Sequence, residues 1–375
     1  SIPNTVPYLN PNTTKTVTDL MQSSRIQTHY KYGPLCERKL ENELGVKKAL
    51  LVHSGTGALE LCALCVGAQQ GVEIIVPSFT FVSTANCFVT HGATPVLVDI
   101  RPDTQNIDET KIEAAITSKT IAICVVHYAG VACEMDTIME IARRHKLYVI
   151  EDNAHGVYGT YKGKMLGSIG DCAALSFHYT KNITCGEGGA LLINNPSMFY
   201  DAFIAWEKGT NRFDFLEGKV DKYEWVGKGG SFVLSEIPAA LLYSQLLERE
   251  YIMQARLSVW TKYFSAIEDL DKQGFLMRPT VPDGCGHNAH IFYILIPDKK
   301  HHELILKKSK ENKIGIFQHY SPLHCSAGSR FCRSLPCDQA VSTANQLLRL
   351  PLWIGMDDDH ISKIVALLYS VLTRE

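Results

Sequence analysis

Three groups of polar residues in this sequence stand directly after short apolar runs, where they could share one site. The first is His53-Ser54-Gly55-Thr56-Gly57, in which small residues precede a helical pattern. Free backbone N–H groups at such a helix start can bind a phosphate. The second is the carboxylate pair Glu151 and Asp152, and the third is Lys181, which precedes a glycine-rich turn at 185–189. Singly, each group is more often a helix cap, a solvated loop or a surface lysine.

Together, the three groups suit a single molecule, pyridoxal 5′-phosphate (PLP). The small residues would hold its phosphate, the acid would pair with its pyridine nitrogen, and the lysine amine would bind it covalently. Asp152 and Lys181 are 29 residues apart, which leaves room for a crossover and a further strand. Because ligands gather beyond the carboxyl ends of parallel strands, we expect both side chains to open on the same edge of one sheet.

The elements that must position these groups follow from an alternation of apolar runs and helical patterns. Strand-like apolar runs occupy residues 49–52, 74–76, 95–100, 121–126, 147–150, 173–177 and 190–193. Helical patterns separate most of them, for example at 57–66, 108–116 and 135–145. Strands that are apolar on both faces and alternate with helices indicate an α/β fold, with a mostly parallel sheet covered on both sides.

The pattern changes near residue 235, where a helical stretch begins that continues to residue 270. Five of its apolar residues are spaced to share one helix face and are expected to pack in a core: Met253, Leu257, Trp260, Phe264 and Ile267. A Pro/Gly-rich break at 279–286 and a smaller α+β stretch follow. We therefore expect a large domain at 1–245 and a small C-terminal domain at 246–375, with residues 1–20 packing on the small domain.

The amino-acid composition argues against several classes of protein. The 375 residues are 46 % hydrophobic and 20 % charged, and their net charge of −2 lacks the basic excess typical of nucleic-acid-binding proteins. No apolar run reaches the length of a membrane span, and the first residues lack the pattern of a signal peptide. The 12 cysteines, spread through apolar segments, indicate reduced thiols in a cytoplasmic protein. Cys62 and Cys65 are expected to be core residues rather than metal ligands.

Six short motifs carry a resemblance to a known family. They are SGTGAL at 54–59, PSFTFVST at 77–84, VDIRPDTQNI at 98–107, EDNAHG at 151–156, SFHYTKN at 176–182 and GEGG at 186–189. In these motifs the sequence resembles the DegT/DnrJ/EryC1/StrS sugar aminotransferases. The resemblance implies the PLP-dependent type I aminotransferase fold, with a mostly parallel mixed sheet, helices on both faces and a smaller C-terminal α+β domain.

The resemblance also implies roles for individual residues. Lys181 matches the lysine that binds the cofactor and moves the proton during transfer, and Asp152 matches the acid that keeps the pyridine nitrogen protonated. His155 stands at a position beside the cofactor ring, and Phe81 matches the aromatic residue that stacks on the ring. Three further residues match the contacts to the phosphate: Gly55, Thr56 and Ser176.

A homodimer with its sites at the subunit interface is a further implication of the resemblance. Many members of the family reach the phosphate of the other subunit's cofactor with an asparagine, and Ser231 takes that position here, where its hydroxyl can still donate a hydrogen bond. In the second domain, His319, Tyr320 and His324 are candidates for substrate binding, because their segment matches the family. For these histidines, a core or surface position is the alternative.

The implied reaction moves the amino group of L-glutamate to a nucleotide-linked keto sugar. Within the family, the sequence most resembles members that aminate C4 of dTDP-4-keto-6-deoxy-D-glucose, which gives dTDP-4-amino-4,6-dideoxy-D-galactose and 2-oxoglutarate. This closer resemblance extends to HYAGVACEMDTIM at 127–139, EKGTNR at 207–212 and HYSPLH at 319–324, among other segments.

Several alternatives stay open at this point. The product could have the gluco configuration at C4, or the substrate could carry UDP. A non-catalytic nucleotide-sugar-binding protein is disfavoured, because a pure binder needs no imine-forming lysine at position 181. A sugar dehydratase on the same scaffold would carry histidine there. A Cys/His hydrolase is disfavoured because no cysteine stands in the context of a nucleophile.

Overall fold

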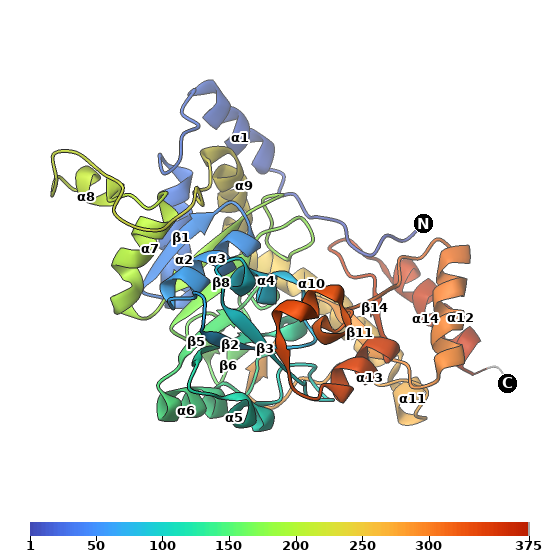
Figure 1. Ribbon diagram of the computed structural model, residues 1–375. Helices are drawn as coiled ribbons and strands as arrows, with labels where there is room; N and C mark the ends of the chain where they lie inside the picture. Colours follow the sequence, from blue (N-terminus) through green and yellow to red (C-terminus); the bar gives the residue numbers. More distant parts are fainter. Residues whose placement is uncertain (374–375) are drawn as a thin grey trace.

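A central sheet, visible in Figure 1, carries most of the predicted site. The computed structural model describes residues 1–373. Eight strands form the sheet, in the spatial order β1 (Lys48–Val52), β9 (Gly189–Ile193), β8 (Cys172–Ser176), β5 (Tyr148–Asp152), β4 (Thr120–Val126), β2 (Glu73–Pro77), β3 (Thr94–Val98) and β13 (Arg333–Ser334). The two pairs that include β9 are antiparallel, and all other neighbours are parallel. The prediction of a mostly parallel mixed sheet is confirmed.

The seven apolar runs predicted as strands all belong to this sheet, and each end lies within two residues of the predicted one. β1, β5 and β8 therefore end beside the three groups of polar residues from which the site was predicted. The eighth strand, β13, comes from the C-terminal part of the chain and was not predicted. It pairs in parallel with β3 at the edge of the sheet.

Helices cover both faces of the sheet, as predicted. One face packs against α3 (Gly55–Cys65), α4 (Ser83–Val89) and α7 (Phe199–Trp206). The other face packs against α2 (Tyr32–Leu44), α5 (Ile112–Ala115), α6 (Met135–His145) and α9 (Glu236–Leu247). Neighbouring strand residues face opposite cores, as Leu50 and Leu51 do. Cys62 is fully buried in the first of these cores, as predicted. The helix predicted at 108–116 is shorter in the structure: it consists of a 3-10 turn, η1 (Glu109–Lys111), that leads into α5.

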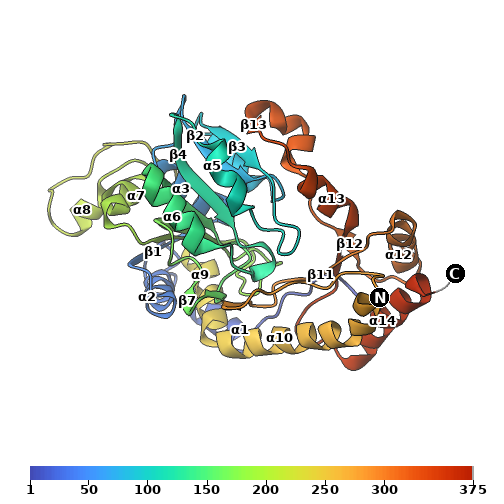
Figure 2. The same cartoon turned by 90° about the horizontal axis from the view of Figure 1, so that it is seen from below.

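The elements that follow α9 surround a second, smaller sheet. Its strands lie in the order β11 (Phe292–Leu295), β14 (Leu347–Leu350) and β12 (Phe317–Gln318). The long helix α10 (Arg249–Ala266) runs along the lower edge of the molecule in Figure 2. The other helices of this part are α11 (Glu268–Lys272), α12 (Lys299–Glu311), α13 (Asp338–Gln346) and α14 (Asp358–Leu372). No helix within residues 1–373 has the length and apolar character needed to cross a membrane.

The buried face of α10 is wider than predicted. Trp260 and Ile267 are buried as expected. Met253, Leu257 and Phe264 are half-buried and pack against the cores, as predicted. The most buried line along the helix lies one position earlier and consists of Ile252, Arg256, Val259 and Tyr263. A search for apolar spacing misses this line, because it contains an arginine. The Arg256 guanidinium is buried and donates hydrogen bonds to the Ala289 and His290 carbonyl oxygens.

Short segments join the two groups of elements. β10 (Cys285–Gly286) pairs with β6 (Thr160–Tyr161), which also pairs with β7 (Lys164–Met165). Near the N-terminus, Ile2 forms a bridge with Ile314, whereas α1 (Thr13–Gln22) packs on α9. Only the beginning of segment 1–20 therefore lies on the C-terminal elements. The remaining short elements are α8 (Arg212–Leu216), η2 (Tyr128–Gly130), η3 (Pro196–Met198), η4 (Leu323–Cys325) and η5 (Ala327–Phe331).

Candidate active site

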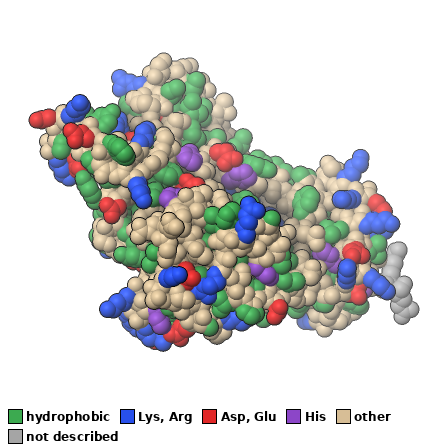
Figure 3. Space-filling model, in the orientation of Figure 1, with side chains coloured by type: hydrophobic (Ala, Val, Ile, Leu, Met, Phe, Trp, Pro, Cys, Tyr) green, Lys and Arg blue, Asp and Glu red, His purple; other side chains and the backbone are tan. Residues whose placement is uncertain are grey.

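A cavity of about 680 Å³ opens at the carboxyl ends of β2, β4, β5 and β8. Histidine side chains are visible around the hollow near the middle of this face in the space-filling view (Figure 3). Elements of the C-terminal part close the cavity from the opposite side, through His290, Phe317 and Arg349. Nine of the predicted site residues line it: Gly55, Thr56, Phe81, Asp152, His155, Ser176, Lys181, His319 and Tyr320.

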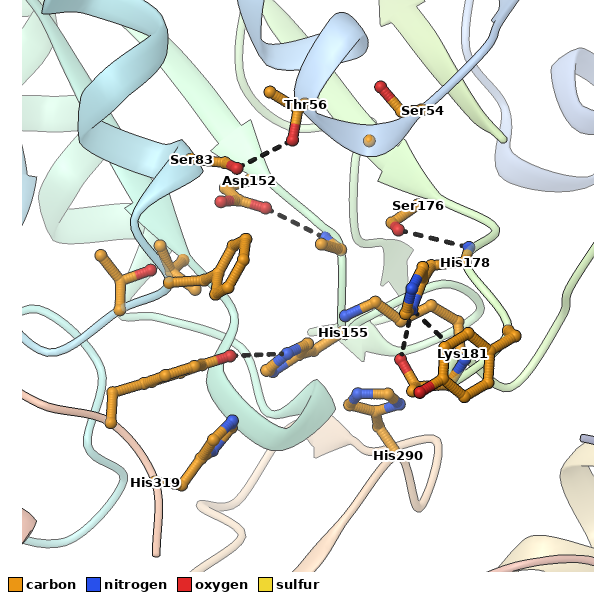
Figure 4. Close-up of a pocket in the computed structure, with 18 of the residues that line it drawn as sticks. Ser54, Thr56, Ser83, Asp152, His155, Ser176, His178, Lys181, His290 and His319 are labelled. Atoms are coloured by element: carbon orange, nitrogen blue, oxygen red, sulfur yellow. Dashed lines mark hydrogen bonds between the residues drawn. The ribbon is translucent and has the colours of Figure 1, made fainter. Parts of the chain in front are cut away.

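The N-terminus of α3 forms one corner of the cavity (Figure 4). Ser54 caps the helix with its hydroxyl, and Thr56 Oγ1 lies 2.8 Å from Ser83 Oγ at the start of α4. Gly55 has no room for a side chain, because a Cβ atom there would lie 2.7 Å from the Cβ of Ser176. This corner therefore presents hydroxyls and free backbone N–H groups without intervening side-chain carbon, which is a combination that binds phosphate.

Asp152 lies at the end of β5, and the residue is only 4 % exposed. Its Oδ2 accepts a hydrogen bond from Thr84 Oγ1 at 2.7 Å, and its Oδ1 accepts one from the Ala154 N–H at 3.2 Å. Burial raises the pKa of this carboxyl, although both hydrogen bonds and the charge of Lys181 act in the other direction. A buried acid of this kind is stabilised in its charged form by a cationic group in the cavity.

Glu151, the neighbouring carboxylate, is completely buried and does not line the cavity. Burial would raise its pKa, but hydrogen bonds from His127 and the backbone outweigh burial and lower it. His127 Nε2 lies 2.8 Å from Oε2, and three backbone N–H groups donate to the two oxygens, from Gly167, Ile169 and Gly170. Glu151 therefore anchors a loop, and of the predicted pair only Asp152 lines the cavity.

Lys181 follows β8 and extends into the cavity beside His155 in Figure 4. Burial lowers the pKa of its amine to about 8; Asp152 opposes this shift and the charge of Arg349 adds to it. The neighbouring Asn182 fixes the loop, because its side chain donates to the Asn288 carbonyl oxygen at 2.8 Å. A lysine with this pKa supplies a useful neutral fraction near neutral pH, and the neutral amine is the nucleophile.

His155 lies between the Lys181 loop and the C-terminal part. Its Nδ1 lies 3.4 Å from the Ala129 N–H and accepts from it, and its Nε2 lies 3.3 Å from Tyr320 Oη. Its ring centroid is 4.3 Å from that of His290. Burial, together with the charge of Lys181, lowers the pKa of His155 well below the usual value. The imidazole is therefore neutral, with its proton on Nε2.

The side chain of Phe81 lies on the rim of the cavity and is 55 % exposed. Its ring centroid lies 6.3 Å from that of Tyr320. An aromatic side chain this open has a free face on which a planar ligand can stack.

Two predicted site residues lie outside this cavity. His324 Nδ1 is 2.6 Å from Ser78 Oγ, so this side chain fastens the 323–325 turn to the end of β2 instead of facing the cavity. Ser231 is exposed and forms a backbone bridge with Glu207. Its predicted contact is with the cofactor of a second subunit, and that contact stays a prediction.

Comparison with known proteins shows to which protein family the chain is related. Residues 7–369 match the DegT/DnrJ/EryC1/StrS aminotransferase family. The chain belongs to this family. The predicted family, the type I aminotransferase fold and the class of enzyme are confirmed at this level, and so is the predicted cofactor, pyridoxal 5′-phosphate.

Relatives and solved structures agree with this assignment. The chain is 32 % identical to the spore coat polysaccharide biosynthesis protein SpsC of Bacillus subtilis, over 97 % of this chain and 95 % of SpsC. It is also 32 % identical to the GDP-perosamine synthase of Caulobacter vibrioides, over 98 % of this chain and 97 % of that protein. The PLP form of Spr1654 from Streptococcus pneumoniae is 25 % identical, with a TM-score of 0.91 over 99 % of this chain and 98 % of that one.

The residues present fit the cofactor of this aminotransferase family. The corner at Gly55 is closed to side chains and open to an anion, and Asp152 is a buried acid without a cationic hydrogen-bond partner among residues 1–373. Lys181 supplies an amine whose lowered pKa favours covalent attachment.

Sequence reasoning missed three residues of the opposite wall, His290, Phe317 and Arg349. His290 follows Pro/Gly-rich loop 279–286, and no pattern around it indicates a ligand. Arg349 stands inside the apolar run LLRLPL at 347–352, where a lone charge is unusual. Arg349 could therefore have been predicted as a site residue from the sequence, because a charged side chain in a buried strand requires a partner or a ligand.

Proposed function

We propose that the protein transfers the amino group of L-glutamate to C4 of dTDP-4-keto-6-deoxy-D-glucose, giving dTDP-4-amino-4,6-dideoxy-D-galactose and 2-oxoglutarate. The observation that carries the aminotransferase chemistry is the position of Lys181, whose pKa is about 8, in the cavity that Asp152 and the Gly55 corner also line. The names of SpsC and GDP-perosamine synthase support a sugar as the acceptor. The nucleotide and the C4 configuration rest on the sequence resemblance.

The proposed cofactor contacts divide by chemistry. Gly55, Thr56 and Ser176 would hold the phosphate of PLP, Asp152 its pyridine nitrogen, and Phe81 one face of its ring. Bound there, the cofactor supplies an electron sink that stabilises negative charge on the carbon that loses a proton. Asp152 strengthens that sink by keeping the pyridine nitrogen protonated, and this positive charge in turn stabilises the buried carboxylate.

Lys181 is the proposed proton carrier. In the first half of the reaction its neutral amine would take the proton from Cα of glutamate and pass it to the cofactor. In the second half it would take a proton back from the cofactor and deliver it to C4 of the sugar. Burial favours the neutral amine at the start, since the charged form loses its hydration. Ping-pong kinetics are expected, because both substrates use the same cavity in turn.

A homodimer is part of the proposal. Phe81 and Lys181 line a cavity that is open on one side, and Ser231 lies on the surface, as a residue that reaches a partner's cofactor must. Light scattering of the cofactor-loaded protein checks this point: a fully active monomer would contradict it.

The test of the reaction is the proton NMR spectrum of the sugar product. The protein is mixed with PLP, L-glutamate and dTDP-4-keto-6-deoxy-D-glucose, and Lys181→Ala serves as the control that gives no product. A small coupling at H4 means an axial amine and supports the galacto product. Two large couplings at H4 mean the gluco epimer and overturn the stereochemical part. No aminated product from the dTDP sugar, with product from a UDP-linked keto sugar, overturns the choice of nucleotide.

A further inference from the structure

Arg349 occupies an unusual place in the small sheet. It lies in β14 between Leu348 and Leu350, and both leucines are buried in the C-terminal core. Because successive side chains of a strand point to opposite faces, Arg349 points away from that core. It lines the active-site cavity instead, on the wall that faces Lys181 and Asp152.

The guanidinium of Arg349 lacks the acceptors that a buried arginine normally has. Its Nε is buried and has no hydrogen-bond partner among the described residues. Arg256, a buried arginine in the same part of the molecule, instead donates to three carbonyl oxygens, of Ala289, His290 and Leu352. A partly buried cation with an unpaired N–H group is costly. The cavity therefore has a place for an anion at Arg349.

His319 orients this guanidinium. Arg349 Nη1 lies 3.4 Å from His319 Nε2, and His319 Nδ1 lies 2.9 Å from Tyr128 Oη. A guanidinium can only donate, so His319 accepts at Nε2 and carries its proton on Nδ1, which donates to Tyr128. Burial, with the charge of Arg349, lowers the pKa of His319 well below the usual value, which agrees with a neutral ring. His319 thus holds one edge of the guanidinium and leaves Nε without a partner.

We infer that Arg349 binds the carboxylate of the amino donor that is attached to its reacting carbon, and that His319 and Tyr128 position it. This inference rests on the proposed function. The phosphate of the cofactor has its own corner at Gly55, across the cavity. Arg349 is close enough to Lys181 for its charge to act on the amine, and the amine must reach Cα of the donor. The α-carboxylate is the anion bonded to that carbon.

The diphosphate of the sugar nucleotide fits Arg349 less well. It is attached at C1 of the sugar, on the opposite side of the ring from C4, where the chemistry occurs. With C4 at Lys181, the diphosphate therefore lies away from the amine. In the second half of the reaction, a neutral sugar hydroxyl would take the place of the carboxylate. Hydrogen bonds between two charged groups are about twice as strong as neutral ones, so Arg349 should matter far more for the donor.

The test measures the two halves of the reaction separately, with cofactor-loaded protein in single turnover. For Arg349→Gln we expect the dissociation constant for L-glutamate to rise about 10- to 100-fold, the range for a lost charged hydrogen-bond pair. The half-reaction with the sugar nucleotide should change less than about 3-fold. Arg349→Lys keeps the positive charge but loses the planar guanidinium with its parallel N–H donors. Its dissociation constant for L-glutamate should therefore lie between those of the wild type and Arg349→Gln. Arg330→Gln, the same change at an exposed arginine, is the matched control and should leave both halves unchanged.

A binding measurement gives a second readout that needs no turnover. Calorimetry of 2-oxoglutarate with the loaded protein should show the same loss in Arg349→Gln and none in Arg330→Gln. L-Glutamine, which has an amide in place of the side-chain carboxylate, separates the two carboxylates of the donor. Arg349→Gln should weaken glutamine as much as glutamate if the α-carboxylate is the ligand. A loss confined to glutamate would overturn this assignment in favour of the side-chain carboxylate.

Two further results would overturn the inference. One is that Arg349→Gln changes the dissociation constants for glutamate and for 2-oxoglutarate by less than about 3-fold, where a rise of about 10- to 100-fold is expected. The other is an equal loss in the sugar half-reaction, which would make Arg349 a nucleotide-sugar residue. If the wild-type protein binds 2-oxoglutarate through Arg349 but does not aminate the dTDP sugar, the proposed acceptor is wrong and the assignment of Arg349 stands.

Discussion

The two walls of the cavity are built in different ways. The wall that fits the cofactor consists of strand ends of the large sheet and the N-terminus of α3. Asp152 ends β5, and Gly55 and Lys181 come a few residues after β1 and β8. The opposite wall takes Arg349 from the middle of β14 and His319 from the loop after β12. The first wall is made of local motifs, and the second exists only because distant segments meet. Under the proposed function, the chemistry common to both substrates resides on the first wall, and binding of the donor on the second.

The largest effect is expected at Lys181, which serves both halves of the reaction. Lys181→Ala should abolish turnover with either substrate, because both proton transfers lose their carrier. Borohydride reduction followed by peptide mass spectrometry should find the cofactor joined to residue 181 in the wild type and unattached in the variant. In the wild type, attachment to the cofactor-free protein should speed up with pH until about 8 and then level off, because only the neutral amine attacks. Turnover by the variant at the wild-type rate would refute the role of Lys181.

Asp152→Asn tests the first wall alone. The amide cannot hold the pyridine nitrogen protonated, so the rates of both half-reactions should fall about 100- to 1,000-fold, the usual range for one lost electrostatic contact. Stopped-flow absorbance of each half-reaction measures the loss, and the retained cofactor absorbance shows that binding persists. The comparison between the walls predicts equal losses for glutamate and for the sugar. A loss confined to one substrate would show that Asp152 contacts that substrate.

The two walls also differ in how far the sequence predicts them. Asp152 is the last residue of β5, and Lys181 comes shortly after β8. The apolar residues of these strands identify the strands in the sequence and hence their ends. Even there, the strand pattern alone does not distinguish Asp152 from Glu151, and only the family resemblance singles out Asp152. The difference between them arises from the 167–170 turn, whose N–H groups reach only Glu151.

The second wall depends on contacts between segments that are far apart in the chain. Tyr128 and His319 are 191 residues apart and meet only because β14 and the loop after β12 lie beside the η2 turn. No spacing rule relates such residues. His324, five residues after His319 and equally suggestive in the sequence, bonds to Ser78 outside the cavity. Single histidines thus reveal their role only after the chain is folded, whereas Arg349 was conspicuous as a charge within an apolar strand.

The smallest expected effect comes from Tyr128→Phe, which removes only the hydroxyl that accepts the His319 proton. The ring remains, so the packing of Tyr128 against Phe79 and Tyr293 should persist. His319 would lose one neutral hydrogen bond, which is worth about 0.5–1.5 kcal/mol, and would hold Arg349 less firmly. The KM for L-glutamate should therefore rise about 2- to 10-fold, while kcat and the sugar half-reaction stay the same. A purely structural role would lower the thermal midpoint and affect both substrates alike, so this split in KM separates positioning of the donor from support of the fold.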